Sequence, residues 1–203
     1  MTIGVIDYDA GNLKSVETAL AHLGYSFFIS NKPEEIDKAD KIIFPGVGEA
    51  RSAMGSLRTY GFDTYIPDKV KTGIPFLGIC VGSQILLSNS EERDTACLDI
   101  VPGKVLRFPD AEGFKVPHMG WNQVKQERPH PIFNGVPNGT SFYFVHSYYT
   151  ALERQADVIG TCDYIDRFSC AYTVDNIVAV QFHPEKSGRH GLRMLDNFCG
   201  GDM

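Results

Sequence analysis

The segment "IPFLGICVGSQILL", residues 74–87, restricts the fold more than any other part of the chain. Its first half is an almost unbroken apolar run, which is typical of a strand covered on both faces of a parallel sheet. Gly78 and Gly82 flank Cys80, and glycine removes Cβ atoms where a strand turns abruptly into a helix. The segment therefore predicts a buried strand that ends in a tight strand–helix junction, with the cysteine at the corner.

Strand-like and helix-like patterns alternate through the rest of the first half. The runs "TIGVID", "YSFFIS" and "KIIFPG" are apolar and rich in β-branched or aromatic residues, as strands are. Apolar residues recur at helical spacing from Leu13 to Leu23, with Asn12 as candidate N-cap and Gly24 as candidate C-cap. A second helical stretch covers residues 50–71. This alternation predicts an α/β fold, a three-layer sandwich with a mixed, mostly parallel central sheet.

The second half has a different pattern. Shorter strand-like segments such as "KVLRF", "SFYFVHSYYTAL" (residues 141–152), "DVIGTC" and "FSCAYTV" are separated by polar turns, which favours an antiparallel addition to the sheet. A final helix is expected from about Arg189 to Phe198. Because the chain of 203 residues contains no linker, repeat or low-complexity segment, we expect residues 1–203 to form a single domain.

Composition excludes several classes of protein. The formal net charge of -6, without a Lys/Arg run, argues against a nucleic-acid surface. No apolar run approaches the roughly 20 residues that span a bilayer, and the N-terminus does not resemble a signal peptide. The five cysteines are odd in number and form no CxxC pair. We therefore expect free thiols, a cytoplasmic location, no membrane association and no metal site.

Cys80 is a candidate nucleophile. "G-I-C-V-G" matches the nucleophile-elbow pattern, with cysteine in place of serine. The N-terminus of the following helix would stabilise a thiolate, and the Val81 N–H would point at a developing oxyanion. The alternative for this stretch alone is a buried cysteine at a tight junction.

"VAVQFHPEKSG" supplies a candidate base at the end of another apolar strand. His183 and Glu185 are two residues apart, so an extended backbone places both side chains on one side. His183 would take the thiol proton, and Glu185 would orient the imidazole. An ordinary His-Pro turn and a His-x-Glu metal pair are the alternatives. The metal pair is the weaker of the two, because no further His or Cys ligands cluster nearby.

Two more loops fit the same site. "FPGVGEA", residues 44–50, follows a strand, and its glycines would allow the Val47 N–H to become a second oxyanion donor. A dinucleotide-binding loop is a poor alternative, because Arg51 stands where the third glycine should be. "FVHSYY", residues 144–149, ends an apolar strand with polar groups, or is simply an aromatic strand end.

These motifs together resemble a known family. "GICVGSQ" with "QFHPEKSG" is similar to the class I (triad-type) glutamine amidotransferases, and the resemblance runs from "IGVIDYDAGNLKSV" to the final helix. "PGVGEARSAM", "PHMGWN" and "YFVHSYY" narrow it to the glutaminase subunits of imidazole glycerol phosphate synthases. The resemblance implies the class I amidotransferase fold with its flavodoxin-like core. Where the family often has Leu-Gly-Met-Gln after the nucleophile, this chain has "VGSQ", which keeps Gln84.

The resemblance also implies a reaction. Cys80 would attack the side-chain amide of glutamine to form a thioester, and His183, oriented by Glu185, would protonate the departing ammonia. Water would then release glutamate, with no cofactor. The residues implied to hold glutamine are Gly48, Gln84, His146, Ser147 and Tyr148.

A partner is implied as well. The ammonia would pass to a TIM-barrel cyclase subunit in a heterodimer, which makes imidazole glycerol phosphate and aminoimidazole carboxamide ribotide in histidine biosynthesis. Trp121, Tyr143 and Lys186 lie at positions that face this partner in the family. The open alternatives are a paralogous subunit of another amidation route, such as surface-sugar amidation, a catalytically idle scaffold, and a stand-alone thiol hydrolase.

Overall fold

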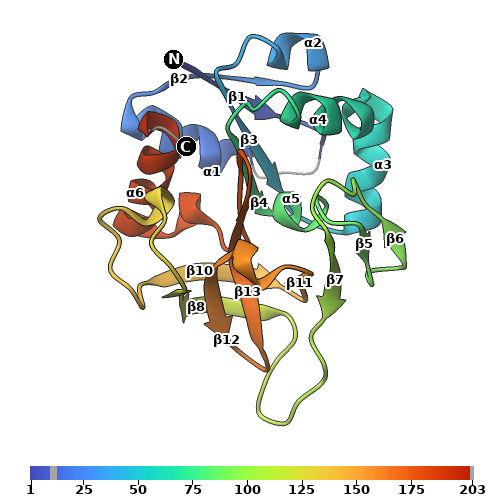
Figure 1. Ribbon diagram of the computed structural model, residues 1–203, viewed down its shortest axis with the longest axis vertical. Coiled ribbons are helices and arrows are strands. Elements are labelled where there is room, and N and C mark those ends of the chain that lie inside the picture. The colour runs from blue at the N-terminus through green and yellow to red at the C-terminus, as the bar shows by residue number, and fades with distance from the viewer. Residues whose placement is uncertain (10–12, 202–203) are drawn as a thin grey trace.

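The computed structural model describes residues 1–9 and 13–201, arranged as a central sheet between two layers of helices (Figure 1). Asn12, the candidate N-cap, lies outside these residues. Five neighbouring strands form the parallel core of the sheet, in the order β2 (Ser26–Ser30), β1 (Thr2–Ile6), β3 (Lys41–Gly46), β4 (Phe76–Cys80) and β14 (Ile177–Val180). The order reverses at β1, from which the chain moves first to β2 and then, on the other side, to β3 and β4. The α/β prediction is therefore confirmed.

Helices cover both faces of this parallel core. On one side lie α1 (Leu13–Leu23) and α6 (Gly188–Gly200), and on the other lie α3 (Ala50–Tyr60), α4 (Phe62–Val70) and α5 (Val81–Gln84) (Figure 1). A short helix, α2 (Pro33–Ile36), packs beside β1 and β2. The single helix expected over residues 50–71 is wrong in one respect. Gly61 adopts φ 76°, in the left-handed region, and so divides the stretch into α3 and α4.

The second half adds antiparallel strands, as expected. Beyond β14 the sheet continues through β13 (Arg167–Val174), β11 (Tyr148–Leu152), β7 (Gly103–Arg107), β5 (Asn89–Ser90) and β6 (Thr95–Ala96). A further strand, β12 (Val158–Asp163), branches from β13, and β9 (Lys125–Gln126) pairs with β12. The remaining short helices are η1 (Pro131–Phe133), η2 (Gln155–Asp157) and η3 (Pro184–Lys186).

One strand-like segment divides between two sheets. The run 141–152 forms β10 (Ser141–His146) and β11, and the chain leaves the first strand for the second at Ser147. β10 pairs with β8 (His118–Gln123) in a separate two-stranded sheet, in which His146 lies opposite His118. The bend at Ser147 therefore joins the small sheet to the large one.

At the strand–helix junction around Cys80, the backbones approach as closely as the flanking glycines predict. A Cβ on Gly82 would overlap the backbone carbonyl oxygen of Phe44 in β3, and a Cβ on Gly78 would lie 3.0 Å from the Leu86 side chain. Gly46, at the end of β3, faces the buried hydroxyl of Tyr8, with which a Cβ there would also collide. The glycines of "FPGVG" and "GICVG" therefore let β3, β4 and α5 meet at one point.

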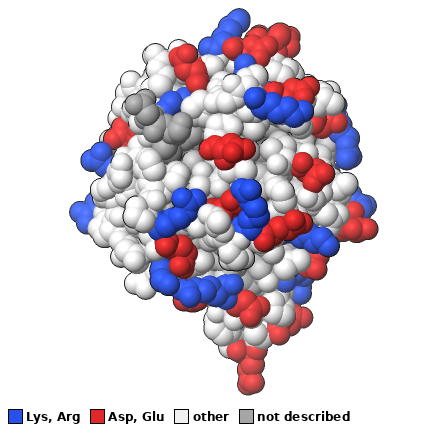
Figure 2. All heavy atoms as spheres, viewed as in Figure 1, with Lys and Arg blue, Asp and Glu red and all other residues white. Residues whose placement is uncertain are grey.

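The distribution of charged side chains on the surface agrees with the absence of a Lys/Arg run in the sequence. Acidic and basic side chains are interspersed over the face in Figure 2, without a broad area of one sign. None of the helices in the described ranges is both long enough and apolar enough to cross a membrane.

The contact at Gly82 makes a stability prediction. Gly82→Ala should destabilise the fold by about 1–3 kcal/mol, because the new methyl group meets backbone that cannot rotate away. Gly55→Ala is the matched control: it lies within α3 with open space around its Cβ position, and should stabilise the fold by about 0.5–1 kcal/mol. Urea denaturation measures both, and a neutral Gly82→Ala would contradict the contact.

Candidate active site

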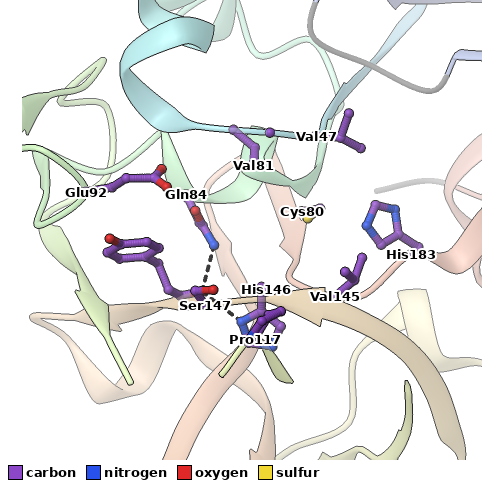
Figure 3. A pocket seen from close by; sticks show the side chains of 12 residues that line it. Val47, Cys80, Val81, Gln84, Glu92, Pro117, Val145, His146, Ser147 and His183 are labelled. Carbon is purple, nitrogen blue, oxygen red and sulfur yellow. Dashed lines mark hydrogen bonds between the residues drawn. The ribbon is translucent and has the colours of Figure 1, made fainter. Parts of the chain in front are cut away.

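A pocket of about 240 Å³ opens at the carboxyl ends of β3 and β4 (Figure 3). In open α/β sheets this edge, near the point where strand order reverses, is where ligands bind. Val47 and Val81 line one side of the pocket, Val145 and His146 line the opposite side, and Cys80 lies between them. The full lining is Val47, Gly48, Cys80, Val81, Gln84, Glu92, Pro117, Val145, His146, Ser147, Tyr148 and His183.

Cys80 occupies the corner between β4 and α5. Its backbone has φ 55° and ψ −113°, a conformation that residues with a side chain rarely adopt and that costs on the order of 1–3 kcal/mol. The side chain is only 3% exposed, yet its sulfur lines the pocket. Strain at a buried cysteine that faces a cavity is typical of a nucleophile held out from a strand.

His183 lies beside Cys80, and Glu185 lies behind it. Figure 3 places the imidazole of His183 next to the sulfur. Its Nδ1 is 2.7 Å from Oε1 of Glu185, and the two side chains are 2% and 3% exposed. Nε2 of His183 makes no hydrogen bond with the described residues, so it is free to exchange a proton with the thiol.

The pKa of His183 is set by its burial and by its two neighbours, Cys80 and Glu185. Burial alone would lower the pKa of His183, but its interactions with Cys80 and Glu185 outweigh burial and raise the pKa to about 10. An imidazole with this pKa keeps a proton at neutral pH once it has accepted one.

Neighbouring backbone fixes the position of His183. Its N–H donates to the Tyr143 carbonyl in β10, at 2.9 Å. The Ser187 hydroxyl donates to the His183 carbonyl at 2.6 Å and accepts from the Tyr143 N–H at 3.0 Å. The small sheet and the candidate base are therefore held together by three hydrogen bonds.

The two candidate oxyanion donors lie on the same side of the pocket. Val81 is the first residue of α5, directly after Cys80, and Val47 follows β3. Gly48 has φ 92°, which residues with a side chain rarely adopt. Glu92 accepts a hydrogen bond from the Ala50 N–H at 2.6 Å, which fixes the far end of this loop.

The candidate glutamine-binding residues also meet here. Gln84 donates through Nε2 to the Tyr148 carbonyl at 2.8 Å and to Oε1 of Gln181 at 2.9 Å, so its own Oε1 is left to accept from a ligand. Both ring nitrogens of His146 are occupied, by the Tyr148 carbonyl and by His118. The His146 side chain therefore supports the pocket, and the atoms it leaves for a ligand are backbone atoms.

Two of the three candidate partner-facing residues lie in the two-stranded sheet, and the third lies in a short helix that contacts it. Trp121, in β8, is 59% exposed, and its ring contacts Tyr143 of β10 with centroids 6.2 Å apart. Lys186 lies in η3, one residue after Glu185. Met119, two residues before Trp121, is 64% exposed and adds a second large apolar side chain to β8.

Sequence reasoning missed several residues of the pocket. Glu92 and Pro117 line it from loops, and Gln181, outside the lining, contacts the Cys80 sulfur through Nε2 at 3.8 Å. Gln181 lies within the quoted segment "VAVQFHPEKSG", and an amide at the end of an otherwise apolar strand was the available signal. No cluster of three or more metal-ligating side chains occurs in the described part of the chain.

The buried histidines predict a pH dependence of stability. Burial lowers the pKa of His118 to about 4 and that of His146 to about 3, against an ordinary 6.5. Between about pH 6.5 and pH 4 the unfolded chain therefore binds protons that the folded chain does not, and each histidine lowers stability by about 1.4 kcal/mol per pH unit as pH falls. His183 does not change this slope. Because its pKa is raised in the folded chain, it stabilises the fold when protonated, and this contribution to stability is fully present below about pH 6.5.

His118→Phe should therefore flatten the loss of stability by about 1.4 kcal/mol per pH unit, because it removes one of the two buried titrating rings. Chemical denaturation of the wild type and the variant across this pH window measures the difference. Parallel curves would contradict the predicted shift.

Comparison with known proteins agrees with this geometry. The profile of the family "Glutamine amidotransferase class-I" matches residues 4–200. The chain is 47% identical over 197 residues to "Imidazole glycerol phosphate synthase subunit HisH" of Dehalococcoides mccartyi (strain CBDB1), covering 97% of this chain and 95% of that protein. It is 48% identical over 207 residues to the protein of that name from Syntrophotalea carbinolica, covering 99% of this chain and 100% of the other.

A solved structure of a glutamine amidotransferase has the same fold, with a TM-score of 0.71 at 22% identity, covering 98% of this chain and 97% of that one. The resemblance identified from the motifs is therefore confirmed: the chain belongs to the class-I glutamine amidotransferases and, within them, to the family of HisH subunits of imidazole glycerol phosphate synthase.

Proposed function

We propose that this chain hydrolyses glutamine to glutamate and ammonia at Cys80 and delivers the ammonia to a cyclase subunit in histidine biosynthesis. The observation that carries the proposal is the strained, buried Cys80 beside a histidine that Glu185 orients, inside a pocket. The names of the relatives support the histidine pathway over another amidation route.

The first chemical step forms a thioester. Nε2 of His183 accepts the thiol proton, and the Cys80 sulfur attacks the amide carbon of glutamine. The negative charge that develops on the amide oxygen is stabilised by the N–H of Val81 and, in our proposal, by that of Val47. His183 then gives its proton to the amide nitrogen, the C–N bond breaks, and ammonia leaves.

The second step regenerates the enzyme. His183 takes a proton from a water molecule, which attacks the thioester carbon, and the thiolate leaves as glutamate forms. The Glu185 carboxylate keeps Nδ1 of His183 protonated and stabilises the imidazolium in both steps. No cofactor enters either step.

Substrate binding is assigned to the groups that the pocket leaves unoccupied. Oε1 of Gln84 accepts from glutamine, while Gly48 and the segment from His146 to Tyr148 bind it through backbone groups and the Ser147 hydroxyl. A pocket of about 240 Å³ suits one amino acid.

The partner is assigned to the face around β8. We propose that a TIM-barrel cyclase binds there to form a heterodimer, with Trp121, Tyr143 and Lys186 at the interface. Exposed Trp121 and Met119 support this assignment, because large aromatic and methionine side chains are enriched at interfaces. We further propose that residues 1–203 act as one domain in the cytoplasm, to which the five free cysteines are suited.

Cys80→Ala tests the function directly. It should reduce glutamine-dependent product formation by the complex more than about 1,000-fold, because the nucleophile is gone. With ammonium salts the same complex should retain its activity, since the thiol is needed only to liberate ammonia. Product assays with each nitrogen source measure this, and loss of both activities would contradict the division of labour.

His183→Asn and Glu185→Gln test the roles within the triad. His183→Asn should cost more turnover, because the imidazole transfers protons while the carboxylate orients it. Glu185→Gln should still lower turnover by up to about 10⁴-fold, as in the serine-protease template. Steady-state glutaminase rates decide between them, and near-normal turnover in Glu185→Gln would remove that residue from the triad.

A further inference from the structure

A chain of buried hydrogen bonds crosses the two-stranded sheet and ends at the pocket, and the proposed mechanism does not use it. Nδ2 of Asn122 lies 3.2 Å from Nε2 of His118, and Nδ1 of His118 lies 3.0 Å from Nε2 of His146. Nδ1 of His146 lies 2.7 Å from the carbonyl oxygen of Tyr148. The two histidines are 3% and 6% exposed, and the bond between them is buried.

Each bond in this chain has one possible direction. The Tyr148 carbonyl can only accept, so Nδ1 of His146 carries the proton. Nε2 of the neutral His146 is then an acceptor, which requires a proton on Nδ1 of His118. Nε2 of His118 accepts in turn from the amide of Asn122.

The Asn122 end of this chain of hydrogen bonds gives the same assignment of the histidine protons independently. Asn122 donates through Nδ2 to the Asp163 carbonyl at 2.9 Å and accepts through Oδ1 from the Gln123 N–H at 2.8 Å. These two backbone contacts fix which end of the amide faces His118. Both ends of the chain therefore place both histidines in the Nδ1–H tautomer.

A second set of bonds reaches the same carbonyl from the nucleophile. Gln84 donates to the Tyr148 carbonyl and to Gln181, whose own Nε2 approaches the Cys80 sulfur. The Tyr148 carbonyl therefore accepts two hydrogen bonds, one from Nδ1 of His146 and one from Nε2 of Gln84. Its orientation, and with it that of the Gln84 side chain, depends on both.

Packing holds His118 in place for this task. Its ring stacks on Tyr164, with centroids 3.9 Å apart, and on Phe144, with centroids 4.9 Å apart. Phe108 and Phe168 meet it edge-on. Burial among these rings also lowers its pKa to about 4, so the ring is neutral at pH 7.

We propose that His118 is a positioning residue for glutamine binding: its Nδ1–H holds His146 so that the Tyr148 carbonyl, and through it Gln84, keep the orientation that the substrate requires. His118 does not line the pocket and touches no reacting atom. This inference rests on the proposed function, since it assigns glutamine to that pocket.

The kinetic experiment compares two substitutions in the complex with the cyclase subunit. His118→Phe keeps a ring between Tyr164 and Phe144 but removes the donor, and should raise KM for glutamine about tenfold with a change in kcat below about threefold. His118→Asn keeps a donor, because its Nδ2 occupies the place of the imidazole Nδ1, and should keep KM within about threefold of the wild type. Tyr164→Leu is the packing control, since it removes the ring that stacks on His118 and leaves every bond of the chain in place, and it should keep KM within about threefold of the wild type.

An unchanged KM in His118→Phe, or equal increases in His118→Phe and His118→Asn, would overturn the proposal in favour of a packing role. Wild-type glutaminase activity in the same assay tests the proposed function separately.

A second measurement needs neither activity nor a variant that folds. Side-chain ¹⁵N shifts of the ¹⁵N-histidine-labelled full chain near pH 7 distinguish the two neutral tautomers. Both His118 and His146 should be in the Nδ1–H form, and Nε2–H or a charged ring at either position would overturn the proposal.

Discussion

The contact between Gly82 and the Phe44 carbonyl is the constraint on which the site depends. It brings the first turn of α5 against the end of β3, closer than any side chain would allow. The chain must therefore turn within one residue, and Cys80 accepts the left-handed φ that this requires. The same turn places Val81 and the loop after Gly46 on one side of the pocket. A single close approach of backbone thus determines both where the Cys80 sulfur lies and which backbone segments surround it.

The antiparallel half of the chain supplies the other side of the pocket. β14 runs parallel to β4 and delivers His183 to the level of Cys80, while β10 and β11 bring the segment from His146 to Tyr148 opposite it. Ser187 forms hydrogen bonds with both His183 and Tyr143, so His183 and the two-stranded sheet are fixed to each other. The parallel core and the antiparallel half therefore meet at the pocket, and the geometry of the pocket depends on their relative position.

The sequence predicted those features that local pattern or motif determines. The alternation of apolar runs gave the parallel core, and the glycines around Cys80 gave the junction. The spacing of His183 and Glu185 placed them on one side, and the structure has them 2.7 Å apart. The break at Gly61 was missed because the helical periodicity continues through it. The division of residues 141–152 between two sheets, and the contacts of Gln181 and His118, depend on partners that are distant in the sequence, which local patterns do not reveal.

The burial of the other cysteines has a consequence for chemical labelling. Cys162, Cys170 and Cys199 are buried in the core, and burial raises the pKa of each, to about 12 for Cys162 and Cys199. Cys97 is partly exposed, but burial still raises its pKa to about 11, so it stays a thiol at neutral pH. Because thiolates react with electrophiles and thiols do so poorly, the folded chain protects four of its five sulfurs. Cys80 lines the pocket, so an alkylating probe sized for that pocket would mark one position per folded molecule and would count the intact pockets in a purified sample.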